Sequence, residues 1–164
     1  MPTFDVMNKL EMSEVTNAVE QARKEVGGRY DFKGTNTAFD LDDKKLTVTI
    51  RSTSADRINA AYEVLLQRMS KRNISVKALD PQADEELPGG TVKRVIKLKN
   101  GIDAENAKKI TGMIKERFSK NCQASINGDL VRVSSKSKDA LQEVMGALRV
   151  QDLPVPIAFG NFRD

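Results

Sequence analysis

The two halves of this 164-residue chain carry the same succession of strand and helix patterns, and this repetition constrains the fold more than any other feature. In the first half, alternating apolar and polar residues predict strands near 4–6, within 30–41, over 46–51 and over 74–79. Apolar residues at helical spacing predict two helices, with Ser13 and Ser54 as N-caps.

Residues 91–164 repeat this order. Strands are expected over 91–99, 122–126, 129–134 and 156–162, and helices after Asp103 and Ser137. Asn127-Gly128 predicts a two-residue hairpin turn that places Ala124 opposite Val131 and Cys122 opposite Val133. The order β-α-β-β-α-β in both halves predicts an α+β tandem of two ferredoxin-like domains, each an antiparallel sheet with both helices on one face.

Residues 81–90 contain two prolines, a glycine pair and no base, which is typical of a linker between a first repeat (1–80) and a second (91–164). Residues 1–90 carry 13 bases and 15 acids, a net charge of −2, whereas residues 91–164 carry 14 bases and 8 acids, a net charge of +6. A basic second repeat indicates an anionic partner. Surplus lysines that only improve solubility explain the same count equally well.

The composition excludes most catalytic chemistry. There is no His and one Cys, so no Ser-His-Asp relay, no Cys/His zinc site and no internal disulfide can form. Glycine-rich nucleotide motifs are absent as well. We therefore expect no catalytic residue, no metal site, no cofactor and no enzymatic activity. An acidic N-terminus and the lack of a long apolar run favour a cytoplasmic protein with no membrane contact.

Basic side chains are the main candidates for ligand contacts. Lys93, Lys97 and Lys99 share one strand face, which suits phosphate contacts but also suits an edge strand protected by lysines. Lys108 and Lys115 share a helix face that follows a glycine turn, and Arg132 points outward from the second hairpin. RNA-recognition domains stack bases on strand aromatics, but their aromatic signature is absent. We expect Tyr30, Phe32 and Phe39 to fill the core or an interdomain contact.

Several short segments resemble the YajQ family of small bacterial proteins along essentially the whole chain. They are Phe4-Asp5-Val6, Arg29-Tyr30-Asp31-Phe32-Lys33-Gly34, Lys99-Asn100-Gly101-Ile102, Ala107-Lys108-Lys109-Ile110, Ile126-Asn127-Gly128, Val131-Arg132-Val133 and Phe159-Gly160-Asn161-Phe162-Arg163-Asp164. Tyr30 departs from the family pattern, which usually has Phe at this position.

The resemblance implies two ferredoxin-like domains whose N-terminal strands, near 4–6 and 92–99, are exchanged. It also implies binding of nucleotides or nucleic acid, a response to cyclic di-GMP in some relatives, and no established catalytic residues. Arg29 and Lys33 would bind phosphate, and Asp31 would accept a hydrogen bond from a base edge. Alternatively, these residues would form an interdomain salt bridge. Asn161 and Arg163 would contact a ligand or fix the chain terminus.

The leading prediction is a non-enzymatic protein that binds nucleotides or RNA phosphates. The alternatives are a signalling adaptor that responds to cyclic di-GMP and binds a protein or DNA partner, and a chaperone-like interaction protein whose lysines only solubilise it. The predicted nucleotide-binding residues are Arg29, Asp31, Lys33, Lys97, Lys99, Lys108, Lys109, Arg132, Asn161 and Arg163.

Overall fold

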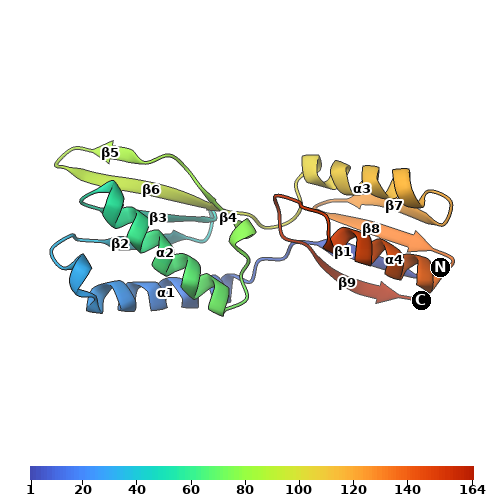
Figure 1. Cartoon of the computed structure of the whole chain (residues 1–164), viewed down its shortest axis with the longest axis horizontal. Coiled ribbons are helices and arrows are strands. Elements are labelled where there is room, and N and C mark those ends of the chain that lie inside the picture. Colours follow the sequence, from blue (N-terminus) through green and yellow to red (C-terminus); the bar gives the residue numbers. More distant parts are fainter. The chain divides into compact units, whose positions relative to one another are not determined.

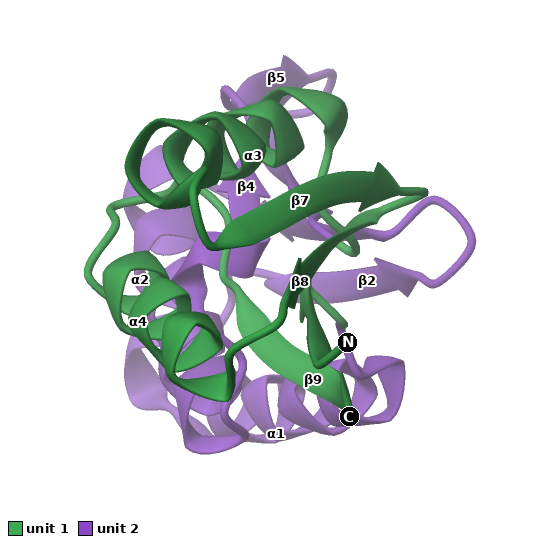
Figure 2. Ribbon diagram, turned by 90° about the vertical axis from the view of Figure 1, so that its right-hand side faces the viewer, with its two compact units in different colours: residues 1–9, 100–164 green, residues 10–99 purple.

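The computed structural model describes residues 1–164 and divides into two compact units. Unit 1 comprises Met1–Lys9 and Asn100–Asp164, and unit 2 comprises Leu10–Lys99, as the chain traced in Figure 1 and the colours of Figure 2 show. Each unit has one sheet and two α-helices. The fold is therefore the predicted α+β tandem of ferredoxin-like units. None of the helices combines the length and apolar character needed to cross a bilayer.

Unit 1 is built on an antiparallel sheet in the order β7–β8–β1–β9. Both of its helices pack on one face of the sheet (Figure 2), where apolar side chains such as Phe4, Ile110, Val133 and Leu148 form the core. Its elements are β1 (Thr3–Met7), α3 (Ala104–Phe118), β7 (Cys122–Asn127), β8 (Leu130–Ser135), α4 (Lys138–Arg149) and β9 (Ala158–Arg163).

Unit 2 has the strand order β2–β3–β6–β4, and β5 also pairs with β6. Its core includes Val19, Phe39, Ile58 and Ile96. The elements are α1 (Met12–Gly28), the 3-10 turn η1 (Tyr30–Phe32), β2 (Ala38–Asp42), β3 (Thr47–Ser52), α2 (Ala55–Lys71), η2 (Val76–Ala78), β4 (Leu79–Pro81), β5 (Glu85–Leu87) and β6 (Thr91–Leu98).

The units do not coincide with the contiguous ranges 1–80 and 91–164. The N-terminal strand β1 pairs with β8 and β9, and the mid-chain strand β6 pairs with β3, β4 and β5. Unit 2 therefore contains the four bases of β6 and its end, giving it 16 bases and 14 acids, while unit 1 has 11 bases and 9 acids. Each unit carries a net charge of +2, so the charge asymmetry along the sequence is not an asymmetry between units.

Residues 81–90 are not a free linker. They include the end of β4 and all of β5, and the turn through Gly89 and Gly90, both at positive φ, returns the chain into β6. Glu85 lies 3.5 Å from Lys93 of β6. The prolines and glycines belong to a hairpin within unit 2. The prediction of a linker is wrong because turns and linkers are rich in the same residues.

The β7–β8 hairpin has a different register from the predicted one. Gly128, at φ +61°, begins the loop rather than ending it, and Asn127 already pairs with Leu130. Ala124 consequently lies opposite Val133, and Cys122 lies opposite Ser135. Because the shift is two positions, every side chain keeps its predicted face.

Candidate functional site

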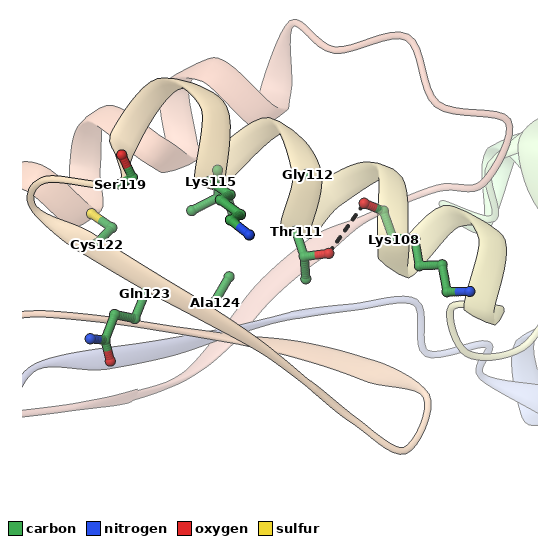
Figure 3. A pocket seen from close by; sticks show the side chains of 9 residues that line it. Lys108, Thr111, Gly112, Lys115, Ser119, Cys122, Gln123 and Ala124 are labelled. Carbon is green, nitrogen blue, oxygen red and sulfur yellow. Dashed lines mark hydrogen bonds between the residues drawn. The ribbon is translucent and has the colours of Figure 1, made fainter.

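A groove of about 650 Å³ runs between α3 and the edge strand β7 in unit 1. Figure 3 shows Lys108, Thr111 and Lys115 on the face of α3 that borders β7, with Gln123 and Ala124 on the strand. Lys108 and Lys115 are two helical turns apart, so their side chains share this face. Gly112 lies between them, and a Cβ at that position would have no neighbouring atom within 4 Å. The missing side chain leaves the wall of the groove open.

The groove combines positive charge with neutral hydrogen-bonding groups. Its lining has two ammonium groups and no carboxylate, together with the hydroxyls of Thr111 and Ser119 and the amide of Gln123. Lys109, the next residue after Lys108, lies outside the lining and is 4.0 Å from Glu105. The arrangement can therefore bind an anion and hydrogen-bond to polar groups attached to it.

Cys122 lines one end of the groove, beside Ser119 at the start of β7 (Figure 3), and is buried. Burial raises the pKa of its thiol, a hydrogen bond with Ser135 lowers it, and the charge of Glu143 raises it, with a net upward shift. A protonated, buried thiol is a poor nucleophile. Cys122 therefore packs as a small apolar residue, as its place in the sequence pattern predicted.

Arg132, Asn161 and Arg163 come together around Asp5, a residue that is not among the predicted binding residues. Asp5 is only 1% exposed and lies on the sheet face opposite the helices. Arg132 donates from Nε and Nη2 to its two carboxylate oxygens at 3.0 and 3.3 Å, and Asn161 Nδ2 donates at 2.7 Å. Asn161 reaches it from a bulged part of β9 with φ +53°. An acid between Phe4 and Val6 in a buried strand was the available signal, because buried charges need partners.

This cluster ties three strands of unit 1 together. Burial raises the pKa of the Asp5 carboxyl, but the hydrogen bonds from Arg132 and Asn161 and the charges of Arg132 and Arg163 outweigh it, so the pKa lies below its ordinary value. The ionised carboxylate holds β8 and β9 against β1. Asn161 therefore fixes the terminal strand, and Arg132 has a structural partner while its side chain remains 42% exposed.

Arg29, Asp31 and Lys33 do not lie on a strand as predicted; Asp31 belongs to the 3-10 turn η1, and the other two flank it. Arg29 donates to both oxygens of Asp31 at 3.0 and 2.7 Å, and this hydrogen bonding is the main reason that the pKa of Asp31 is lowered. Arg29 and Asp31 thus neutralise each other within unit 2. Lys33 lines a second depression, of about 560 Å³, together with Tyr30.

Lys97 and Lys99 lie apart from that turn. The C-terminal end of β6 lies at one end of unit 2, and the C-terminal end of α1, which the turn follows, lies at the other end (Figure 1). Lys97 is exposed, and β6 is hydrogen-bonded to strands on both sides. The lysines therefore do not protect an edge strand. The ten predicted residues fall into separate places: Lys108 in the α3–β7 groove, Lys109 beside it, Arg132, Asn161 and Arg163 around Asp5, and the remaining five in unit 2.

The fold defines a class of α+β proteins that carry two ferredoxin-like units in one chain. The family model described as "Nucleotide-binding protein YajQ-like" matches residues 2–163. A nucleotide-binding protein of Anaeromyxobacter sp. (strain K) is 45% identical over 164 residues, covering 100% of both chains. Another from Chloroherpeton thalassium is 45% identical over 161 residues, covering 98% of this chain and 97% of the relative. The chain belongs to the YajQ-like nucleotide-binding protein family, which confirms the resemblance found in the sequence.

Proposed function

We propose that this chain is a non-enzymatic protein that binds nucleotides or RNA phosphates, and that the α3–β7 groove is its main binding site. One observation carries the proposal: the groove gathers Lys108 and Lys115 with neutral polar groups and no carboxylate. The names of the relatives, nucleotide-binding proteins, support the ligand class. A volume of about 650 Å³ is in the range of small-molecule sites, roughly 300–1,000 Å³.

Each lining group has a role that suits its chemistry. The ammonium groups of Lys108 and Lys115 neutralise phosphate, and flexible lysine side chains do so without strict geometry. The hydroxyl of Ser119 can donate to a phosphate or ribose oxygen, whereas the hydroxyl of Thr111 donates to the backbone carbonyl of Lys108 at 3.1 Å and can accept from a ligand. The Gln123 amide both donates and accepts, so it suits the polar edge of a base.

The absence of turnover is part of the proposal. The lining carries no His and no carboxylate, and its thiol has a raised pKa. Such a site has no group ready to take or give a proton near neutral pH. We expect nucleoside triphosphates and cyclic dinucleotides to be recovered unchanged, and hydrolysis above background would contradict this part of the proposal.

The test compares three single variants, Lys108→Ala, Lys115→Ala and Lys109→Ala, which remove the same charge from one helix. RNA affinity is measured by fluorescence anisotropy at rising salt. Each lost phosphate contact should weaken binding and lower the salt slope by about 0.7 for single strands. We expect this effect for Lys108→Ala and Lys115→Ala but not for the control Lys109→Ala. Equal effects for all three variants, or none, would contradict the site.

Calorimetry with GTP, short RNA and cyclic di-GMP identifies the ligand class. Binding of GTP and RNA with similar dependence on Lys108 supports the proposal. Selective tight binding of cyclic di-GMP alone would favour the signalling adaptor with a protein or DNA partner. Binding of none of them would favour the chaperone-like role.

A further inference from the structure

Tyr30 is the most exposed large hydrophobic side chain of the chain, at 89%. The sequence predicted that it fills a core or an interdomain contact, and the neighbouring aromatics Phe32 and Phe39 are indeed buried in unit 2. We infer that Tyr30 is a stacking platform for an unpaired nucleobase, at a second site that is separate from the α3–β7 groove. The inference rests on the proposed function for its ligand class only.

The turn that carries Tyr30 is held in place by contacts of the two residues that follow it, Asp31 and Phe32. Phe32 is 5% exposed, and the guanidinium groups of Arg29 and Arg57 lie 5.0 and 5.7 Å from the centre of its ring. Arg57 Nη1 also donates to the backbone carbonyl of Asp31 at 3.0 Å, and Thr35 Oγ1 donates to that of Phe32 at 2.6 Å. The backbone around Tyr30 is therefore fixed while its ring faces solvent. A ring presented in this way loses little conformational entropy on binding.

The surroundings of the ring favour an anionic ligand. The depression of about 560 Å³ that Tyr30 lines has two basic side chains, Arg29 and Lys33, and no carboxylate in its lining. Arg29 is already paired with Asp31, so Lys33 supplies the ammonium group. Gly27, Gly28 and Gly34 also line it, and a Cβ at any of them would meet no atom within 4 Å. Backbone and ring therefore stay accessible to a flat ligand.

An aromatic ring next to a lysine matches one unpaired base with its adjacent phosphate. Base stacking on aromatic side chains does not depend strongly on sequence, and an ammonium group neutralises the backbone charge. Single-stranded RNA provides both groups, whereas duplex RNA keeps its bases stacked on each other. An exposed Tyr can also anchor a protein partner, but the lining without acids favours the nucleic acid.

The composition provides a direct optical test. The chain has no Trp and two Tyr, so a Tyr62→Phe variant leaves Tyr30 as the only strong fluorophore. Tyr62 is partly buried beneath Arg94 and packs against the core of unit 2. We expect a single-stranded uridine octanucleotide to quench the fluorescence of Tyr62→Phe with saturation, and a duplex of the same length to leave it unchanged. The inference would be overturned if the octanucleotide did not quench the fluorescence, or if only the duplex quenched it with saturation.

Affinity measurements separate the stacking site from the groove. Tyr30→Ala should weaken octanucleotide binding by about five- to 150-fold, while Tyr30→Phe should retain it because stacking needs the ring and not the hydroxyl. Lys33→Ala should lower the salt slope by about 0.7, whereas Lys45→Ala, an exposed lysine of the same unit, should not. Unchanged affinity in Tyr30→Ala, with a thermal unfolding midpoint equal to that of the wild type, would overturn the inference. Quenching that persists in Lys108→Ala/Lys115→Ala would support it even if the groove proposal failed.

Discussion

Asp5 and Arg132 are 127 residues apart in the chain, yet Arg132 donates to both carboxylate oxygens of Asp5 across the β1–β8 pair, at 3.0 and 3.3 Å. The two partners differ in their environment. Asp5 is 1% exposed, whereas the Arg132 side chain is 42% exposed. Removing one partner is therefore not equivalent to removing the other.

We predict that Arg132→Ala destabilises the protein more than Asp5→Asn. In Arg132→Ala the buried carboxylate loses two hydrogen bonds and the nearest opposite charge, and keeps the hydrogen bond from Asn161 and the charge of Arg163; a buried charge with too few partners is costly. In Asp5→Asn the guanidinium can turn to solvent, so the loss is that of charge-assisted hydrogen bonds, about 1.5–3 kcal/mol. Urea denaturation of both variants measures the difference.

The control is Lys138→Ala, which removes an exposed ion pair with Asp164 whose atoms lie 2.8 Å apart. Exposed pairs contribute little to stability, so we expect no measurable change in the unfolding midpoint. A larger loss of unfolding free energy in Asp5→Asn than in Arg132→Ala would contradict the prediction. It would show that leaving the buried carboxylate without Arg132 is not the costlier change.

Asp5 also predicts how stability depends on pH. Its pKa in the folded protein is lowered, so its contribution is fully present above the pKa of an unfolded Asp, about 3.9, and is lost as the pH falls through the folded value. Asp5→Asn should therefore lose stability relative to the wild type near neutral pH, and this difference should shrink below about pH 4. Thermal unfolding midpoints of both proteins from pH 7 to pH 2.5 test this, and a difference that stays constant over that range would contradict it.

Gly112 and Gly146 offer a matched pair of helix-interior glycines. Both have open space where a Cβ would lie, but only Gly112 lines the α3–β7 groove. Replacing either by Ala should stabilise the protein by roughly 0.5–1 kcal/mol, since Ala restricts the unfolded chain and favours helix. Gly112→Gln should additionally lower nucleotide affinity because its side chain enters the groove, whereas Gly146→Gln should not. Denaturation and calorimetry on the four variants measure the two effects, and equal nucleotide affinity in the two Gln variants would argue against the groove.

Local patterns in the sequence predicted most of the elements but not how they are assigned to units. Ser54 and Ser137 cap helices as expected, accepting hydrogen bonds from the backbone N–H groups of Arg57 and Ala140. Which sheet receives β1 or β6 depends on contacts distant in the chain, and periodicity carries no information on such pairing. The charge asymmetry between residues 1–90 and 91–164 is misleading for the same reason. The count assigns the bases of β6 to the second half of the chain, whereas β6 belongs to the sheet of unit 2.

The candidate site was only partly predictable. The helical spacing of Lys108 and Lys115 gave their shared face, but the groove itself depends on the position of Gly112 over an edge strand. The sequence pattern predicts a buried Tyr30, because aromatic residues near strands usually pack inside. Its exposure follows from the 3-10 turn, in which Phe32 is the residue that points into the core. A strand pattern cannot distinguish which of two nearby aromatics is buried.

Cys122 provides a reporter for the groove, because it is the only thiol of the chain and lines one end of the groove. Burial is the main cause of its raised pKa, and the thiolate is the form that reacts. We predict that iodoacetamide alkylates the native protein far more slowly than the urea-unfolded protein at pH 8. The native rate should also still rise above about pH 9.5, where the rate of a free thiol has nearly levelled off, because that pH is about one unit above the free thiol's pKa. Saturating nucleotide should slow the native reaction further by covering the groove, and it should not do so in Lys108→Ala/Lys115→Ala. Initial rates from mass spectrometry measure all three effects. A native rate equal to the unfolded one would contradict the buried thiol, and a rate that bound nucleotide leaves unchanged would place the ligand elsewhere.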